Sequence, residues 1–240
     1  MLGRFVSLRE KVATFRQRPH IPWVVEKRLR EHWPKLHRLI KYRTTDPTSK
    51  KYWDGVWTEE GATTWRTYPN LFSVICGRLR PNLRVLDVGC GPGVLLTWIK
   101  ERVSPHCFGL DMSEVAVRLL KNQKMPGVVA QLPGIPFKDA SFDAVIATEV
   151  IEHVHDPTRT LAEMCRVAKV GGLVVFSVPN ECMTTDECDE HLHDFDRETV
   201  LAMVQGRGEV EVLDIEDKGG ARLLAVIRKP APCLPQDRES

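Results

Sequence analysis

Residues 85–93 read Val-Leu-Asp-Val-Gly-Cys-Gly-Pro-Gly, an apolar run that ends in three glycines at alternate positions. The apolar run is typical of a buried strand, and the amphipathic segment 94–102 that follows it is typical of a helix. Glycines at such a turn let the backbone approach a ligand closely, and the start of the helix offers its N–H groups to negative ligand groups. The stretch therefore predicts the first strand–loop–helix unit of a ligand-binding α/β domain.

The spacing of the glycines narrows the class of ligand. Dinucleotide sites use G-x-G-x-x-G/A, whereas this loop has G-x-G-x-G and Val94 at the position of the third glycine. A phosphate-binding P-loop is excluded because no G-K-[ST] follows the glycines. Asp111 ends the next apolar run, where a carboxylate can accept hydrogen bonds from both ribose hydroxyls. The sequence therefore favours a nucleoside ligand over a dinucleotide.

Apolar runs and amphipathic segments alternate along the rest of the chain, which is typical of a parallel sheet with helices on both faces. A Gly219-Gly220 turn near the end indicates that the last two strands pair as a hairpin. We expect an α/β, Rossmann-like, doubly wound and mostly parallel seven-stranded sheet, with an antiparallel hairpin at its end and an N-terminal helical extension. The expected strands cover residues 84–88, 107–110, 128–131, 142–147, 173–178, 210–215 and 222–227. The expected helices cover residues 71–79, 94–102, 113–122, 157–167 and 199–204.

Charge divides the chain into unequal parts. Residues 1–50 hold 13 Lys and Arg against 4 Asp and Glu, while residues 51–240 hold 21 against 28. We expect a basic helical arm over 1–50, the α/β domain over 51–230 and a polar tail over 231–240. Such an arm favours contact with an anionic surface. The candidate surfaces are its own domain, a membrane, a protein or a nucleic acid. The acidic domain itself gives no strong nucleic-acid signal, and the sequence leaves the oligomeric state open.

Cysteine usage and hydropathy indicate the compartment. The seven cysteines are scattered without a CxxC pair, which argues against a disulfide framework or a thiolate zinc site. No uncharged apolar run reaches the roughly 18 residues that a spanning helix needs. We therefore expect a cytoplasmic location.

Three ordered motifs together resemble the class I S-adenosylmethionine-dependent methyltransferases. They are residues 87–93, residues 109–113 (Gly-Leu-Asp-Met-Ser) and residues 132–143 (Leu-Pro-Gly-Ile-Pro-Phe-Lys-Asp-Ala-Ser-Phe-Asp), and the likeness extends over about 84–228. The resemblance implies S-adenosyl-L-methionine as the cofactor. The residues that it assigns to cofactor binding are Asp87, Gly89, Cys90, Gly91, Gly93, Asp111, Met112, Gln131, Leu132 and Thr148.

The resemblance also implies a role for each part of this set. The glycine loop would surround the methionine part of the cofactor, and Asp111 would hold the ribose hydroxyls. Met112 would pack against the adenine, and the backbone N–H of Leu132 would contact the edge of the ring. Gln131 stands where the family often has an acidic residue, and its amide oxygen can accept the same bond from the adenine amino group. Thr148 and Glu149 would face the sulfonium and the methyl acceptor.

Residues 149–157 are where we expect the chemistry. Methyl transfer from a sulfonium mainly requires alignment of the acceptor and, for a hydroxyl, removal of a proton. His153 is a candidate general base and Glu149 a second candidate catalytic residue, although a histidine there is equally suited to bonding the backbone. A helical turn that began at Glu149 would place Glu149, Glu152 and His153 on one face.

Those three side chains, with His191 or His193 as a fourth, also suit a divalent metal. The pattern resembles the metal cluster of the small-RNA terminal ribose methyltransferases and of some ubiquinone-biosynthesis O-methyltransferases, in which a metal would polarise the acceptor hydroxyl. The pattern is common, so no metal ligand is assigned from the sequence.

The sequence indicates the methyl acceptor mostly by excluding other classes of substrate. The fourth strand does not end in an N/D-P-P-Y-type sequence, which disfavours methylation of DNA or glutamine amino groups. We expect the methyl acceptor to be a hydroxyl oxygen of a small molecule or a lipid-linked intermediate. The alternatives are a metal-assisted RNA ribose methyltransferase and a catalytically silent cofactor-binding module that docks a partner. Trp53, Trp57 and Trp65 are candidates either for a lid over the acceptor or for covering the sheet edge.

Overall fold

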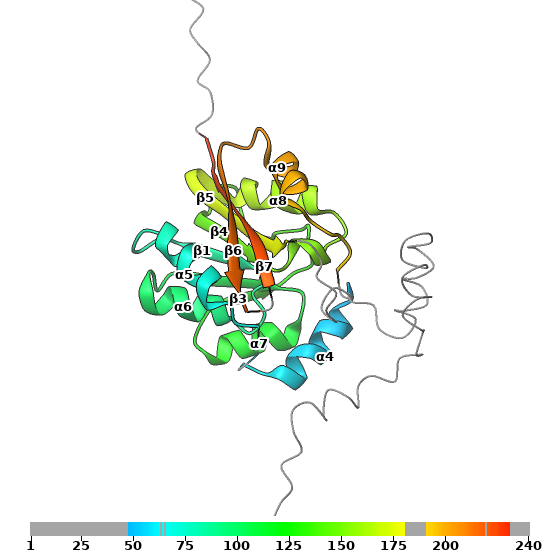
Figure 1. The fold of residues 1–240 in the computed structure, drawn as a ribbon. Helices are drawn as coiled ribbons and strands as arrows, with labels where there is room; N and C mark the ends of the chain where they lie inside the picture. Colours follow the sequence, from blue (N-terminus) through cyan, green and yellow to red (C-terminus); the bar gives the residue numbers. More distant parts are fainter. Residues whose placement is uncertain (1–47, 63, 65, 181–190, 219, 231–240) are drawn as a thin grey trace, which may run out of the picture. The chain divides into compact units, whose positions relative to one another are not determined.

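The computed structural model describes residues 48–62, 64, 66–180, 191–218 and 220–230 (Figure 1). These residues belong to the second of two compact units, which cover residues 1–46 and 47–240. Nearly all of the expected basic arm, the polar tail and the acidic loop 181–190 lie outside the described residues. Among the described residues, no helix combines the length and the apolar character needed to cross a bilayer.

A single sheet forms the centre of the described unit. Its seven strands lie in the order β3-β2-β1-β4-β5-β7-β6, and only the pairs β5–β7 and β7–β6 are antiparallel. The expected mostly parallel sheet with a final antiparallel hairpin is confirmed. The strands are β1 (Val85–Val88), β2 (Cys107–Asp111), β3 (Gly127–Val129), β4 (Phe142–Thr148), β5 (Ala168–Pro179), β6 (Glu209–Asp217) and β7 (Gly220–Arg228).

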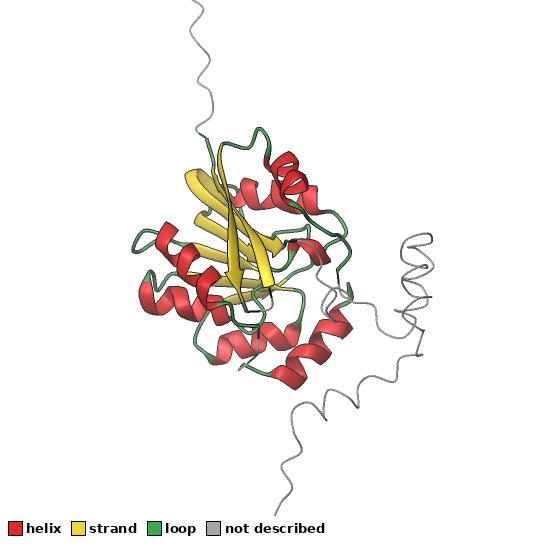
Figure 2. Ribbon diagram, in the orientation of Figure 1, coloured by secondary structure: helices red, strands yellow, loops and turns green. Residues whose placement is uncertain are grey.

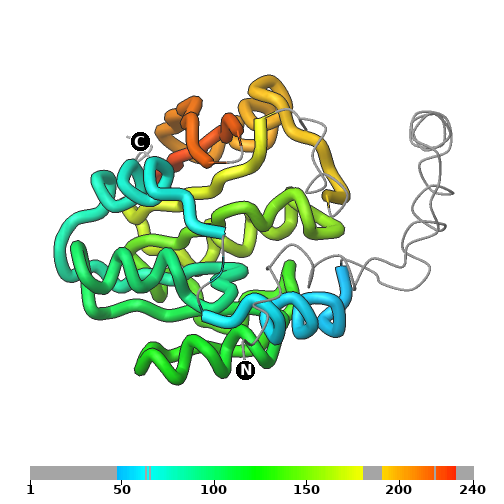
Figure 3. The backbone as a smooth tube through the Cα atoms, turned by 60° about the horizontal axis from the view of Figure 1, so that its bottom comes forward, coloured from blue at the N-terminus to red at the C-terminus, as the bar shows by residue number. Residues whose placement is uncertain are grey.

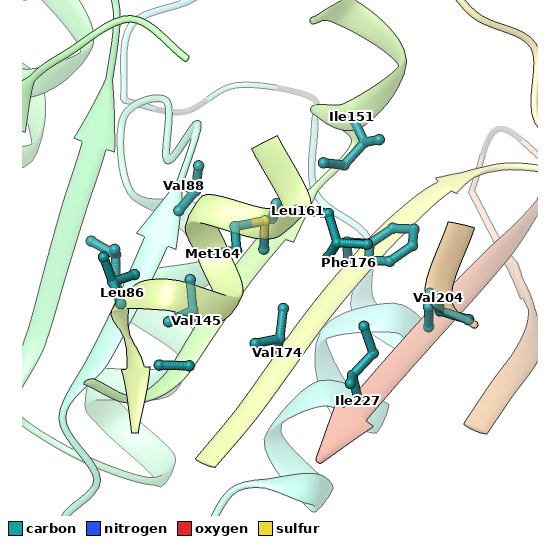
Figure 4. Packing of buried hydrophobic residues seen from close by; sticks show 14 of the residues in the cluster. Leu86, Val88, Val145, Ile151, Leu161, Met164, Val174, Phe176, Val204 and Ile227 are labelled. Atoms are coloured by element: carbon teal, nitrogen blue, oxygen red, sulfur yellow. The ribbon is translucent and has the colours of Figure 1, made fainter. Parts of the chain in front are cut away.

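Helices cover both faces of the sheet, as Figure 2 shows. On one face, buried side chains of α5, α6 and α7 pack on β1, β4 and β5. On the other face, α8 and α9 cover a second cluster that includes Leu86, Leu161 and Phe176 (Figure 4). The helices are α4 (Lys50–Glu60), α5 (Pro69–Arg78), α6 (Val94–Arg102), α7 (Glu114–Asn122), the short 3-10 helix η1 (Ile151–His153), α8 (Pro157–Val167) and α9 (Arg197–Val204).

Side-chain caps explain where several helices begin. Ser49, Ser113, Asp156 and Asp196 each accept a hydrogen bond from a backbone N–H in the first turn of the helix that follows. Such caps, together with apolar periodicity, are local signals, and α8 has the bounds expected from the sequence. Helix α6 also has the expected bounds, although Gly93 gives it no side-chain cap. The sequence prediction did not include α4.

All seven strands differ from the expected ranges by at least one residue, and for two of them the difference follows directly from strand pairing. β3 ends at Val129 rather than Gln131, since its ladder to β2 stops where Asp111 pairs with Val129. β5 begins at Ala168 rather than Leu173, because Ala168 pairs with Phe142 before a register shift in the ladder. Neither difference changes the order of the strands.

The parallel strands bring three chain segments to one edge of the sheet. β1, β2 and β4 lie side by side with Asp87 opposite Gly109 and Ile146. Their carboxyl ends therefore place the glycine loop, Asp111 and the residues after Thr148 next to one another. Helix α4 lies alongside α7 at this edge (Figure 3). This edge is where a ligand is expected to bind.

Candidate active site

A cavity opens at this carboxyl edge and encloses about 1070 Å³ when its open mouth is included. Such a size suits a ligand as large as a nucleoside. The structure brings together in its wall all but one of the residues that the sequence selected. The selected residues that line it are Asp87, Gly89, Cys90, Gly91, Asp111, Met112, Gln131, Leu132, Thr148, Glu149 and His153.

Gly93 is the selected residue that does not line the cavity. It caps α6 in a left-handed conformation (φ 87°), and a Cβ there would lie 2.4 Å from a methyl carbon of Leu120. Its lack of a side chain therefore serves the packing of α6 against α7. Gly91 (φ 50°) has its bare face toward Trp57 of α4, whose Cζ2 would lie 2.9 Å from an added Cβ. The glycine loop is thus covered directly by an aromatic side chain.

Asp111 is held in place by backbone donors at the end of β2. Gly91 N donates to Oδ2 and Ser113 N donates to Oδ1, each at 2.8 Å. Burial raises the pKa of Asp111 to about 6, although the Ser113 and Gly91 N–H groups partly oppose that rise. Each carboxylate oxygen has two lone pairs, so the two oxygens retain acceptor capacity for a pair of hydroxyls. This arrangement fits a ribose.

Asp87 lies beneath the loop at the end of β1. Its side chain is buried, and its Oδ1 has no hydrogen-bond partner among the described residues. Burial, with a contribution from the nearby Asp111 charge, raises the pKa of Asp87 well above its usual value. An unsatisfied buried acceptor costs about 1–3 kcal/mol, so a ligand ammonium at this position would relieve both the missing bond and the missing countercharge. An amino acid end of a ligand fits here.

Glu149 follows β4 and does not begin a helical turn. Its backbone is left-handed (φ 55°), and the turn begins later, at Ile151. Ser177 Oγ donates to its Oε1 at 2.8 Å, and Arg222 Nε donates to its Oε2 at 3.0 Å. The expected shared face of Glu149 with Glu152 and His153 is therefore wrong, because Glu149 is oriented by β5 and β7.

Glu152 and His153 instead converge with His191. One ligand atom from each of the three lies within 4.8 Å of the others. Glu152 is 1% exposed, neither of its oxygens has a hydrogen-bond partner among the described residues, and its Oε1 lies 3.9 Å from His153 Nε2. Burial, followed by repulsion from Glu149, raises the pKa of Glu152 well above its usual value. The group has the donor atoms of a divalent metal site.

The chain segment after residue 190 is fixed against η1. Leu192 N and His193 N both donate to the carbonyl oxygen of Glu152, at 2.8 and 3.2 Å. This places the ring of His191 5.0 Å from that of His153. The His193 ring contacts the carbonyl oxygen of Val154 at 2.9 Å, so of the two candidates for a fourth position His191 is the one in the group.

Aromatic side chains form the remaining wall. Trp53 stacks on Trp57 with ring centroids 5.9 Å apart and meets the His153 ring edge-on at 5.4 Å. Tyr68 and Phe72 line the same cavity. Trp53 and Trp57 therefore lie in the cavity wall, whereas Trp65 is outside the described residues.

Several residues of this site were missed from the sequence. Arg222 lies 73 positions from Glu149, and Asp54 lies 59 positions from the Ser113 hydroxyl that donates to it. No local pattern reveals such pairs. The start of α4 did carry a signal, since Ser49 is an N-cap residue and Trp53 and Trp57 have helical spacing.

The sheet order, the glycine loop and Asp111 define a Rossmann-like nucleoside-binding domain. Residues 86–176 match the family described as "Methyltransferase domain". This match supports the resemblance of the chain to the class I S-adenosylmethionine-dependent methyltransferases. The cofactor of this family is S-adenosyl-L-methionine, and the acceptors at Asp87 and Asp111 fit its amino and ribose groups.

Curated relatives match part of the chain. The ubiquinone biosynthesis O-methyltransferase of Hahella chejuensis is 36% identical over 107 residues, which are 42% of this chain and 44% of that protein. An uncharacterized methyltransferase of Schizosaccharomyces pombe is 33% identical over 144 residues, 53% of this chain and 52% of that protein. The chain thus spans about half the length of the curated relatives it matches.

Solved structures share the fold at low sequence identity. The complex between the Haloferax volcanii Trm112 methyltransferase activator and a putative methyltransferase matches with a TM-score of 0.61 at 18% identity, covering 75% of this chain and 93% of that one. The Haemonchus contortus phosphoethanolamine N-methyltransferase 2, solved with S-adenosyl-L-methionine, gives 0.59 at 16% identity, covering 79% and 59%. At these identities the likeness concerns the fold alone.

Proposed function

We propose that the protein transfers a methyl group from S-adenosyl-L-methionine to a hydroxyl oxygen of a small molecule or a lipid-linked intermediate. The observation that carries the proposal is the position of His153 in the cavity wall, next to Trp53 and on the same sheet edge as the glycine loop and Asp111. A base and an aromatic surface thus share one cavity with the residues proposed for the cofactor.

The proposed residue roles follow from these positions. When bound, the cofactor supplies an electrophilic methyl group, so the protein needs to align the acceptor and take its proton. Asp111 accepts the ribose hydroxyls, Asp87 holds the ammonium, and the backbone around Gly89 and Gly91 shapes the loop. Met112, Gln131 and Leu132 surround the adenine, while Cys90 and Thr148 complete the wall.

On the acceptor side, we assign His153 as the general base that removes the hydroxyl proton. We assign Glu149 a positioning role, because Ser177 and Arg222 already engage both of its oxygens. The aromatic rings of Trp53, Tyr68 and Phe72 suit a planar or apolar acceptor body. The O-methyltransferase names of several relatives support oxygen as the acceptor atom.

The test is methyl transfer from labelled cofactor to a panel of phenols, catechols and lipid-extract hydroxyls. We expect transfer to a hydroxyl compound, and a 10²- to 10⁴-fold loss in the His153→Asn variant with cofactor affinity unchanged. Transfer to amines alone would contradict an oxygen acceptor. Tight cofactor binding with no transfer to any acceptor would instead favour the silent docking module.

The convergence of Glu152, His153 and His191 favours a second candidate, a metal-assisted reaction. In that form Glu152, His153 and His191 would hold a divalent cation, which would polarise the acceptor hydroxyl. The candidate acceptors would then include the terminal ribose of an RNA. Chelator-treated protein is assayed before and after Mg²⁺, Mn²⁺, Co²⁺ or Zn²⁺ is restored, with Glu152→Gln as the matched variant. Activity that chelation does not change contradicts the metal-assisted candidate.

We propose that residues 1–50 form a basic arm through which the domain 51–230 docks on an anionic surface or a partner, and that residues 231–240 form a tail. We also propose that the protein is cytoplasmic. The charge of the arm supports the first proposal, and the free thiols of Cys76, Cys90, Cys107 and Cys165 suit a reducing compartment. Deletion of residues 1–43 is expected to weaken binding to anionic vesicles or a partner while cofactor affinity stays within about twofold. A large loss of cofactor affinity would refute this division of roles.

A further inference from the structure

Helix α4 precedes the matched residues 86–176 and yet forms part of the cavity wall. Its Asp54 carboxylate accepts hydrogen bonds from Ser113 Oγ at 2.6 Å and Val115 N at 3.2 Å, at the start of α7. Lys50 adds an ion pair with Glu114 at 2.9 Å. Helix α7 begins at Glu114, three residues after Asp111, so these contacts fix α4 beside the proposed ribose site.

One turn after Asp54, Trp57 reaches the glycine loop. A Cβ added to Gly91 would lie 2.9 Å from Cζ2 and 3.0 Å from Cη2 of the indole, so the ring lies directly on the loop backbone. Only 7% of Trp57 is exposed, and the residue lines the cavity. Its Nε1 is buried and has no hydrogen-bond partner among the described residues. A buried indole N–H normally has an acceptor.

Two unsatisfied buried groups of opposite kind therefore line one cavity around the glycine loop. Asp87 Oδ1 is an acceptor with no donor, and Trp57 Nε1 is a donor with no acceptor, among the residues described. An α-amino acid zwitterion carries the complement of both, an ammonium that donates and a carboxylate that accepts. We propose that Trp57 Nε1 donates a hydrogen bond to the methionyl carboxylate of the cofactor, opposite the ammonium held by Asp87.

This assignment rests on the proposed cofactor site and extends it to a residue outside the matched domain. It makes α4 a part of the cofactor site, because the same helix contacts Ser113 through Asp54 and the glycine loop through Trp57. Removing the indole N–H should then lower affinity only for ligands that carry the carboxylate.

The test uses calorimetry on the full chain with two ligands. S-adenosylhomocysteine carries both the ammonium and the carboxylate, whereas its decarboxylated analogue, 5′-deoxy-5′-(3-aminopropylthio)adenosine, keeps the ammonium alone. Trp57→Phe keeps an aromatic ring against Gly91. We expect it to lower the affinity for S-adenosylhomocysteine about 10- to 100-fold and the affinity for the analogue less than about twofold. Asp87→Asn should lower the affinity for both ligands. Trp53→Phe should change the two affinities by the same factor.

Equal losses for both ligands in Trp57→Phe would overturn the assignment, because the indole would then contribute packing alone. So would an unchanged affinity for S-adenosylhomocysteine. The wild-type protein gives a measurement that needs no variant, since it should prefer S-adenosylhomocysteine over the analogue by about 10-fold or more, and equal affinities would also refute the proposal. Wild-type protein that binds neither ligand would instead contradict the cofactor site itself.

Discussion

The ion pair between Arg222 and Glu149 gives the sharpest stability prediction. Arg222 is 3% exposed and Glu149 is 13% exposed, with Nε and Oε2 3.0 Å apart. Arg222 also donates to the carbonyl oxygens of Lys218 and Gly220 and lies over the Tyr68 ring at 4.0 Å. We expect the two single substitutions to be unequal, because Arg222 keeps two carbonyl partners when the pair is broken, whereas Glu149 keeps the Ser177 hydrogen bond but loses the positive charge of Arg222.

Arg222→Met leaves the Glu149 carboxylate in a buried wall without its cation, which costs about 3–5 kcal/mol. For a domain of this size the melting temperature should fall by about 6–20 °C. Glu149→Gln should cost about 1–3 kcal/mol, since Arg222 keeps its carbonyl partners. The double variant should lose about 2 kcal/mol less unfolding free energy than the two single variants lose together.

Urea unfolding followed by tryptophan fluorescence measures these energies. The matched control is Arg228→Met on the same strand, whose side chain is 50% exposed and lies 4.0 Å from Glu209, and it should cost less than about 1 kcal/mol. Two results would refute the assignment of Glu149 to this buried pair. One is a double variant whose loss of unfolding free energy equals the sum of the single losses, and the other is single losses as small as that of Arg228→Met.

Two further predictions concern the cofactor site. S-adenosylhomocysteine affinity, measured by calorimetry, should be nearly constant above pH 7 and fall as the pH drops through about 6, where Asp111 takes up a proton. The same raised pKa means that protonation of Asp111 stabilises the fold, so melting at pH 5.5 should show no loss from this group, and affinity unchanged down to pH 5 would contradict its role. Gly91→Ala should lower the affinity at least tenfold, because the φ of 50° disfavours alanine by about 1–2 kcal/mol and the new Cβ meets Trp57. Gly55→Ala in α4, which meets nothing within 4 Å, should leave affinity unchanged and raise stability by about 0.4–1 kcal/mol; equal effects of the two alanines would count against a special role for Gly91.

The first strand–loop–helix unit was predictable because its signals are local. A continuous apolar run, glycines that adopt positive φ and an amphipathic helix occur within residues 85–102, and the structure forms each as expected. Asp111 was predictable for a related reason, since parallel strands bring their carboxyl ends to the same edge. The expected placement of these residues around one cavity agrees with the structure.

The acceptor side was less predictable because its contacts join distant residues. The expected helical turn from Glu149 does not form, since the side chain is drawn to Ser177 on β5 and Arg222 on β7. His191 was a candidate partner of His153, but its selection over His193 depends on backbone bonds between Leu192, His193 and Glu152. Such pairings require the folded chain.

The central claim is that the carboxyl edge of the sheet binds the nucleoside of S-adenosyl-L-methionine through Asp111. The most direct test is calorimetric titration of S-adenosylhomocysteine at pH 8 into the wild-type protein and Asp111→Asn. We predict one site per chain in the wild type and at least tenfold weaker binding in the variant, at a comparable melting temperature. No binding by the wild type, or equal binding by both proteins, would contradict the claim.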